Sequence, residues 1–176
     1  VVSLLTKSGS NEWKFGGAIE WSPSSLREPG KDVVTRNTNA SDPLFVYRSD
    51  NESDSVVYSA YASGPIIKDR LFFFAMLEGR DSQIDKFGSL TSSRQTNTDP
   101  QALVKLDWNI TDNHVMEFTG IYNQNKTQVK TYEYDSGYNV GEHQTQTDAY
   151  EIENGGKIGI LKYTGYLTDN FTLSAQ

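Results

Sequence analysis

The sequence predicts an all-β protein, a segment of an antiparallel transmembrane β-barrel with short turns at one end and long loops at the other. Three observations predict it. Apolar residues recur at every second position in stretches of about ten residues, as in strands that cross a bilayer. Tryptophans stand near the ends of these stretches. Short turn sequences and long polar stretches alternate along the chain, whereas a soluble sandwich has no such asymmetry.

Composition narrows the class further. The 176 residues suffice for about one domain. The formal charge of -7 argues against a nucleic-acid partner, because phosphate neutralisation needs surplus cations. The chain has no cysteine, which excludes disulfides and thiolate chemistry. The longest apolar run, Leu71–Leu77, is far shorter than the roughly 20 residues of a membrane helix, but a barrel strand needs no such run.

The first strand is expected at residues 12–21. On one face it carries Trp13, Phe15, Gly17, Ile19 and Trp21. The opposite face is small or charged, because successive side chains of a strand point to opposite sides. A long polar loop is expected from Ser22 to about Asp54.

Two strands follow, at residues 56–63 and 70–80, joined by a tight turn at 64–69. Residues 71–77 are apolar on both faces, so in a barrel the inward face of this segment would pack on protein. A second long loop is expected from Asp81 to Pro100.

A hairpin is expected at residues 103–122. Leu103–Ile110 and His114–Tyr122 alternate, and Thr111–Asn113 between them favours a turn. The apolar face is formed by Val104, Leu106, Trp108, Met116, Phe118, Gly120 and Tyr122. A helix over 114–122 is the competing interpretation.

The sequence Asn109–Asn113 is echoed by Tyr166–Asn170. Aligning the two predicts strands at 157–166 and 171–176, with Leu161 and Tyr163 on the apolar face. A chance match between common turn residues is the alternative. The long polar segment 124–155 before this hairpin is expected to be a third loop.

We therefore expect one set of side chains to face lipid. They are Trp13, Phe15, Ile19, Trp21, Val104, Leu106, Trp108, Met116, Phe118, Tyr122, Leu161 and Tyr163. In hydrocarbon only a closed sheet pairs every backbone group of its strands, and tryptophan and tyrosine suit the headgroup level. The alternative places these residues in the core of a soluble protein.

Two phrases resemble a known family. Thr6–Gly17, TKSGSNEWKFGG, resembles the join between plug and barrel in TonB-dependent outer-membrane receptors of the Oar-like group. Gly64–Phe74, GPIIKDRLFFF, resembles the first periplasmic turn of the same group, and a Glu-Gly pair follows it. The chain departs from the family's motifs at three places: Ser10 stands for threonine, Trp13-Lys14 for an aromatic-histidine pair, and Arg70 for lysine. Beyond residue 100 the hairpins resemble the family only in their general pattern.

The resemblance implies a barrel of about 22 strands in the outer membrane of a Gram-negative bacterium, closed by a plug and driven by TonB. Short turns would lie in the periplasm and long loops outside. Residues 1–10, with Val1–Lys7 as a last plug strand, would be the end of the plug and its join to the barrel. Residues 11–176 would be the first roughly seven strands of a longer chain, incomplete at both ends. Implied partners are membrane lipid, the TonB complex through the absent plug, and envelope proteins such as a surface-exposed lipoprotein.

The function expected from the resemblance is ligand uptake across the outer membrane. A non-transporting adhesin or scaffold on the same barrel is the alternative, and a soluble carbohydrate-binding β-sandwich is the second alternative. No phosphate-cradling glycine loop, nucleophile elbow or acid–base carboxylate pair is recognisable. The sequence therefore predicts neither an enzyme nor a cofactor.

Three polar features remain. His114 and His143 lack a second ligand at metal spacing and are expected to be solvated. Ser49–Asp54 has enough oxygens for calcium but not the spacing of a calcium loop, so a solvated charge run is the default. The third long loop carries Tyr132, Tyr134, Tyr138 and Tyr150, which would either stack on a sugar or another ligand or pack the loop.

Overall fold

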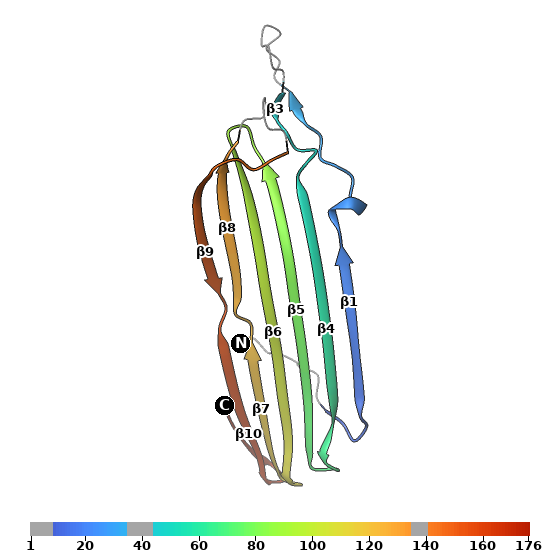
Figure 1. Cartoon of the computed structure of the whole chain (residues 1–176). Helices are drawn as coiled ribbons and strands as arrows, with labels where there is room; N and C mark the ends of the chain where they lie inside the picture. Colours follow the sequence, from blue (N-terminus) through green and yellow to red (C-terminus); the bar gives the residue numbers. More distant parts are fainter. Residues whose placement is uncertain (1–8, 35–43, 135–140) are drawn as a thin grey trace.

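The structure, a computed structural model, describes residues 9–34, 44–134 and 141–176. These residues form a nine-stranded antiparallel sheet, which confirms the predicted all-β antiparallel class (Figure 1). Along the sheet lie β1 (Lys14–Ser22), β4 (Glu52–Ile67), β5 (Leu71–Phe87), β6 (Thr91–Thr111), β7 (His114–Tyr122), β10 (Lys157–Thr168) and β11 (Phe171–Ala175). The other two strands of the sheet are β8 (Asn125–Glu133), which pairs with β6, and β9 (Gln146–Asn154), which pairs with β8.

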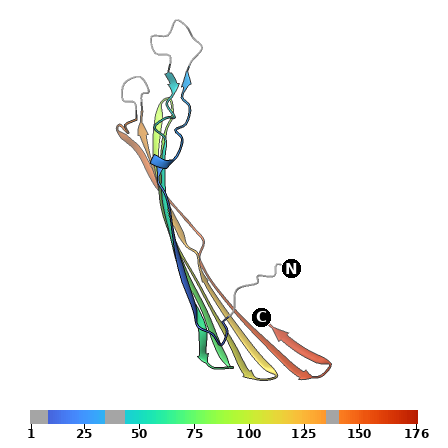
Figure 2. The same cartoon turned by 90° about the vertical axis from the view of Figure 1, so that its right-hand side faces the viewer.

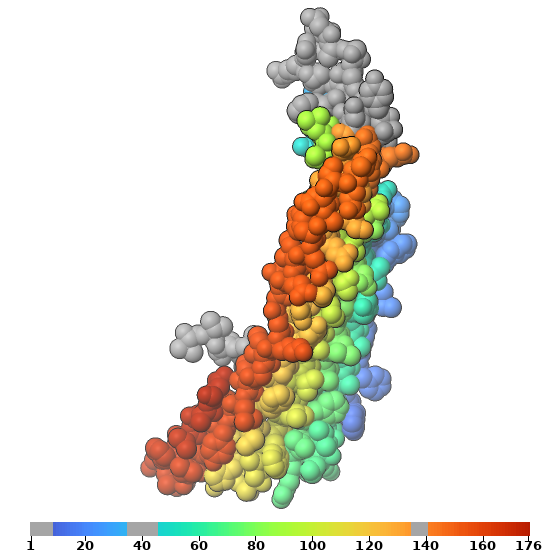
Figure 3. Space-filling view, turned by 60° about the vertical axis from the view of Figure 1, so that its left-hand side comes forward, coloured from blue at the N-terminus to red at the C-terminus, as the bar shows by residue number. Residues whose placement is uncertain are grey.

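β7 and β8 form one interrupted ribbon beside β6, and β9 and β10 form another. The two breaks meet, because the Asn123 amide donates to the Gly156 carbonyl at 3.0 Å and the Gly156 amide donates to Asn123 Oδ1 at 3.0 Å. Gly155 has a φ of 83°, a left-handed conformation that favours glycine. Figure 3 shows β9, β10 and β11 as one orange-to-red edge of the molecule.

The tight turns gather at one end of the sheet, here named the short-turn end. Residues 68–70, 112–113 and 169–170 all lie there (Figure 2). The β1–β4, β5–β6 and β8–β9 connections begin and end at the opposite end, the far end. The β1–β4 connection contains η1 (Ser24–Leu26), β2 (Val33–Val34) and β3 (Leu44–Val46). The predicted gathering of the short turns at one end is confirmed. The expected restriction of long loops to the other end is wrong, because the short connection of residues 88–90 joins β5 to β6 at the far end.

Two predicted loops were wrong. Residues 81–87 continue β5 and residues 91–100 continue β6, while β8 and β9 occupy much of 124–155. Serine, threonine, asparagine and glutamine do not stop a ladder whose two faces both meet water. Pro100 is tolerated in β6 because it pairs with Gly79 on one side and lies between the β7 and β8 ladders on the other.

The sheet is a single layer, seen edge-on in Figure 2. Within the described residues its only hydrophobic residues classed as buried are Phe74, Phe87 and Tyr134. No second sheet packs face to face on it in the described part, where the remaining pairing is the two-stranded β2–β3 ladder. The described residues contain no helix with the length and hydropathy of a membrane span. The predicted plug strand Val1–Lys7 lies outside them.

Candidate membrane-facing surface and far-end site

The pairing register assembles one uncharged row across the sheet. Residues directly opposite each other in neighbouring strands share a face. The row runs through Phe15, Ala62, Ala75, Val104, Gly120 and Gly159. We name the side that carries this row face A and the opposite side face B.

All the side chains expected to face lipid lie on face A. Leu106, Phe118 and Leu161 form a second row, and Trp108, Met116 and Tyr163 form a third. Trp13, just before β1, meets the ring of Phe73 at 5.5 Å, while Phe15, Ile19, Trp21 and Tyr122 follow by alternation. Many of these side chains are exposed: Phe15 by 81% and Ile19 by 80%. Exposed apolar surfaces of this extent are typical of faces that contact a partner or a membrane.

The apolar part of face A has aromatic boundaries. Trp13 lies just before β1 and Trp21 near its end. They are separated by roughly 26 Å of extended chain, which at the usual strand tilt spans about 20 Å of the roughly 25 Å apolar band of a barrel. Trp108 and Tyr163 lie near the short-turn end, and Tyr122 marks the opposite boundary beside Lys157. We call this region the apolar band. Toward the far end, face A becomes charged.

Face B carries an ion network opposite the apolar band. Lys105 Nζ lies 3.1 Å from Asp107 Oδ1 and 3.4 Å from Glu117 Oε1, and Glu117 Oε2 lies 2.9 Å from Lys162 Nζ. Lys105 is only 7% exposed, so it needs these partners. The buried ring of Phe74 stacks on Tyr61 at 6.1 Å. Face B is therefore polar with apolar patches.

At the far end, Asp85 is the centre of a buried cluster. Its carboxylate accepts hydrogen bonds from Arg94 Nε at 2.7 Å and Arg94 Nη2 at 3.1 Å. Gln83 Nε2 donates to it at 2.9 Å, and His143 Nε2 lies 3.0 Å away. Burial alone would raise the pKa of Asp85, but the hydrogen bonds from Arg94, His143 and Gln83 outweigh it and lower the pKa.

His143 is not solvated as expected, since its side chain is 11% exposed. Its ring is sandwiched between Phe87 at 5.0 Å and Tyr132 at 4.5 Å, and its Nδ1 lies 2.8 Å from Ser92 Oγ. We name this arrangement the His143 clasp. It joins the β8–β9 connection to β5 and β6, and residues so far apart in sequence could not be matched from the sequence alone.

Ser92, His143 and Asp85 are linked in the order of a hydrolase triad. The side chain of Ser92 is fully buried, however, so no substrate can reach its hydroxyl. The Asp85 carboxylate forms an ion pair with Arg94 in addition to its contact with His143. The geometry is that of a structural clasp rather than of an activated nucleophile.

The four tyrosines predicted to lie in the third long loop have different environments. Tyr134 is 3% exposed, packs on Phe87 at 5.3 Å, and accepts a hydrogen bond from the Gly141 amide at 3.3 Å. Burial raises its pKa. Tyr134 therefore packs the loop, and Tyr132, at the end of β8, stacks on His143. Tyr150 lies in β9 and is half exposed, while Tyr138 lies outside the described residues.

A cavity of about 430 Å³ adjoins the clasp. It is lined by Asp50, Glu52, Asp85, Phe87, Arg94, Gly141, Glu142 and His143. Nearby acidic and amide oxygens already bind the chain itself: Asn51 Oδ1 accepts from the Phe87 amide and Asp54 Oδ1 from the Ser24 amide, both at 2.8 Å. In the part of the chain described, no cluster of three or more histidine or carboxylate groups could hold a metal ion. The geometry gives the calcium hypothesis no support, and Glu52–Asp54 belongs to β4.

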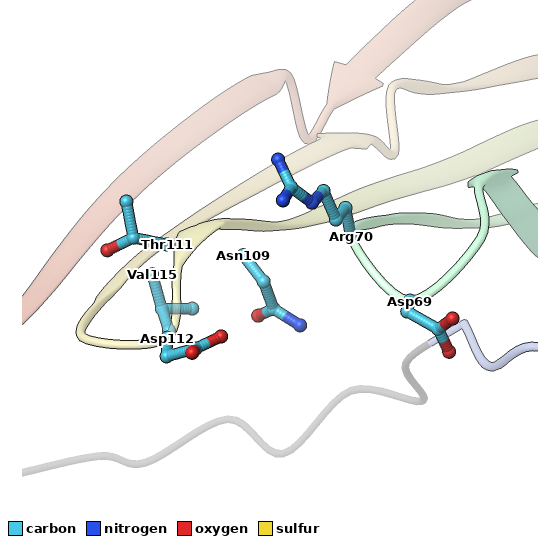
Figure 4. A pocket seen from close by; sticks show the side chains of 6 residues that line it. All are labelled: Asp69, Arg70, Asn109, Thr111, Asp112 and Val115. Atoms are coloured by element: carbon cyan, nitrogen blue, oxygen red, sulfur yellow. The ribbon is translucent and has the colours of Figure 1, made fainter.

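The short-turn end carries a second cavity, of about 390 Å³, between two turns (Figure 4). Its lining is Asp69, Arg70, Asn109, Thr111, Asp112 and Val115. Asn11 holds the adjoining turn, because its side chain donates to Asp69 Oδ1 at 2.6 Å and accepts from the Asp69 amide at 2.9 Å. His114 is also not free: its Nδ1 lies 2.6 Å from the Tyr163 hydroxyl.

Comparisons with protein-family models, with curated proteins and with solved structures found no match.

Proposed function

We propose that this chain forms part of the wall of an outer-membrane β-barrel, in a TonB-dependent receptor that takes up a ligand. The observation that carries the proposal is the apolar band of face A, which runs from β1 through β4, β5, β6 and β7 to β10 and has aromatic residues at its boundaries. Lipid tails would cover it without leaving polar groups unpaired. Covering it is favourable by about 25 cal/mol for each Å² of apolar surface.

The two edges of the sheet support a longer wall. In the described residues, β1 pairs only with β4, and β11 pairs only with β10. Their outer backbone groups need partners in hydrocarbon. We propose that further strands of the same protein supply them and that face B, with its ion network around Lys105, lines the interior.

The receptor assignment rests on the two phrases at residues 6–17 and 64–74, which resemble the Oar-like group. A non-transporting adhesin or scaffold is the second candidate. One observation favours it: β5, β6, β8 and β9 extend beyond the apolar band and are fastened by the His143 clasp, so they would form a rigid surface platform.

Membrane insertion can be tested with single cysteines, because these 176 residues contain none; any cysteine elsewhere in the full-length protein is first replaced by serine. We would introduce single cysteines in the full-length protein, reconstituted into vesicles that contain brominated lipids, at Ala62 and Val104 on face A and at Ser59 and Thr119 on face B. Each is labelled with a small fluorophore, and quenching by brominated lipids is measured. Face A labels should be quenched and face B labels should not. Equal quenching of both sets would refute a membrane wall.

TonB dependence needs a separate test. The full-length protein in detergent is mixed with the periplasmic domain of TonB from the same bacterium, and binding is measured by calorimetry. Saturable binding is expected of a receptor. If the lipid test succeeds but TonB does not bind, the adhesin or scaffold replaces the receptor.

A further inference from the structure

The strands beyond the apolar band have two chemically different faces. On face A this extension is charged, with Asp81, Asp85, Arg94, Lys126, Lys130, Glu151 and Glu153. Several are paired there, as Lys126 with Glu151 at 3.4 Å. Charged side chains are what a surface in water normally carries.

On face B the same strands carry no charge over two complete rows. One row is Ser55, Ser82, Asn97, Thr127 and Ile152, and the other is Ser53, Ile84, Gln95, Val129 and Tyr150. The next row on each side of these two rows is charged. Arg80 and Asp99 lie in the row on one side, and Lys86 and Asp148 lie in the row on the other. We name these two rows the neutral wall.

The polar side chains of the neutral wall are ordered by hydrogen bonds. Asn97 donates to Ser82 Oγ at 3.0 Å and accepts from Thr127 Oγ1 at 2.7 Å and from Gln95 Nε2 at 3.1 Å. These four residues are half-buried, whereas Tyr150 presents its ring with 50% exposure. The wall thus combines fixed hydroxyl and amide groups with one accessible aromatic ring.

This chemistry selects a class of ligand. A charged ligand would find no counter-charge in either row. A purely apolar ligand would make no use of the donors and acceptors that Gln95 and Asn97 have left after bonding to each other and to Ser82 and Thr127, and it would separate them from water. A neutral sugar satisfies both conditions, because its hydroxyls donate and accept and its apolar ring face can lie on a tyrosine.

We propose that the neutral wall binds an uncharged oligosaccharide on the inner side of the barrel, above the membrane. The inference rests on the proposed function, which makes face B the interior surface. It names the ligand class of the receptor, and it assigns contact roles to Gln95, Asn97 and Tyr150, which the sequence placed in loops.

The test uses the full-length protein in detergent on an array of neutral, anionic and cationic oligosaccharides and uncharged peptides. The best neutral glycan is then titrated by calorimetry. Asn97→Asp, which removes a donor but keeps the size, and Tyr150→Ala should each weaken binding about tenfold. Thr98→Asp is the matched control, since it adds the same charge one residue along β6 on face A, and it should change affinity by less than about twofold.

Binding of peptides or charged glycans alone, or no binding of any neutral glycan, overturns the proposal. So does an equal loss in the Thr98→Asp control. Gln95→Glu is a second variant in case Asn97→Asp does not fold, as judged by its migration in the folded form on a gel. If lipid quenching of face A labels persists while glycan binding is absent, only this inference fails. If lipid quenching fails, the proposed function fails first.

Discussion

The His143 clasp should control how firmly the β8–β9 connection is held to the sheet. His143→Ala removes the contacts to Ser92 Oγ at 2.8 Å and Asp85 Oδ1 at 3.0 Å and two ring contacts. At about 1 kcal/mol for each hydrogen bond and about 0.5 kcal/mol for each ring contact, the local free energy of opening should fall by about 3 kcal/mol. Amide exchange should then accelerate roughly 100-fold.

Hydrogen exchange measured on the full-length protein checks this prediction. The reporters are the amides of Glu133, which donates to the Thr145 carbonyl, and Tyr134, which donates to the Leu90 carbonyl. His114→Ala is the control, because the side chain of His114 meets Tyr163 at the short-turn end, far from the clasp, and its loss should leave both reporters unchanged. Unchanged exchange in His143→Ala would refute the reasoning, as would acceleration confined to the short-turn end.

Three further predictions follow from particular residues. The pKa of Asp85 is lowered on folding, so the stability that its carboxylate contributes is complete above the ordinary value of 3.8 and is lost as pH falls through the folded pKa. Exchange of the Tyr134 amide, corrected for intrinsic rates, should therefore rise as pH falls below about 4. Unchanged exchange in that range would contradict this. Val104→Arg should lower the free energy of unfolding of the membrane-inserted protein by about 2–4 kcal/mol in a refolding titration. Ser59→Arg on face B is the control and should lower it by less. Equal losses would count against a lipid-facing face A. Asp69 has a φ of 63°, a left-handed conformation that glycine adopts more easily than alanine. Asp69→Ala should therefore destabilise the turn by about 1–2 kcal/mol more than Asp69→Gly, as measured by exchange of the Arg70 amide. The same value for both variants would mean that the backbone is not strained there.

The strands at the short-turn end could be predicted because two signals coincide there. His114–Tyr122 was predicted with the bounds that β7 has, since the period of two is unbroken and a turn sequence precedes it. The phase of alternation also placed Trp13, Leu106 and Tyr163 on one face before any register was known. Their contact with lipid stays a prediction.

The far end could not be predicted in the same way. Polar residues at 81–100 look like a loop because the one-sided apolar signal disappears where both faces of a strand meet water. The ladder itself continues, since backbone pairing does not depend on apolar side chains. His143 joins residues 51 and 58 positions away, and no local pattern encodes such a meeting.

Along β6, the residues on face A change from apolar to polar or charged, and this change bears on the proposed function. Its 21 residues span roughly 70 Å, or about 50 Å along the membrane normal at the usual barrel tilt, so in the proposed barrel only part of it would lie in the roughly 30 Å of hydrocarbon. Between Trp108 and Ala102 the face A positions are all apolar, and from Thr98 to Arg94 they are polar or charged. On face B, Asp107 and buried Lys105 lie opposite the band, Asp99 stands next to Pro100, and neutral Asn97 and Gln95 follow beyond it. A strand in a uniform solvent would have no reason to exchange charge between its faces at the same point. A membrane boundary near Pro100, with an interior on the other face, gives that reason.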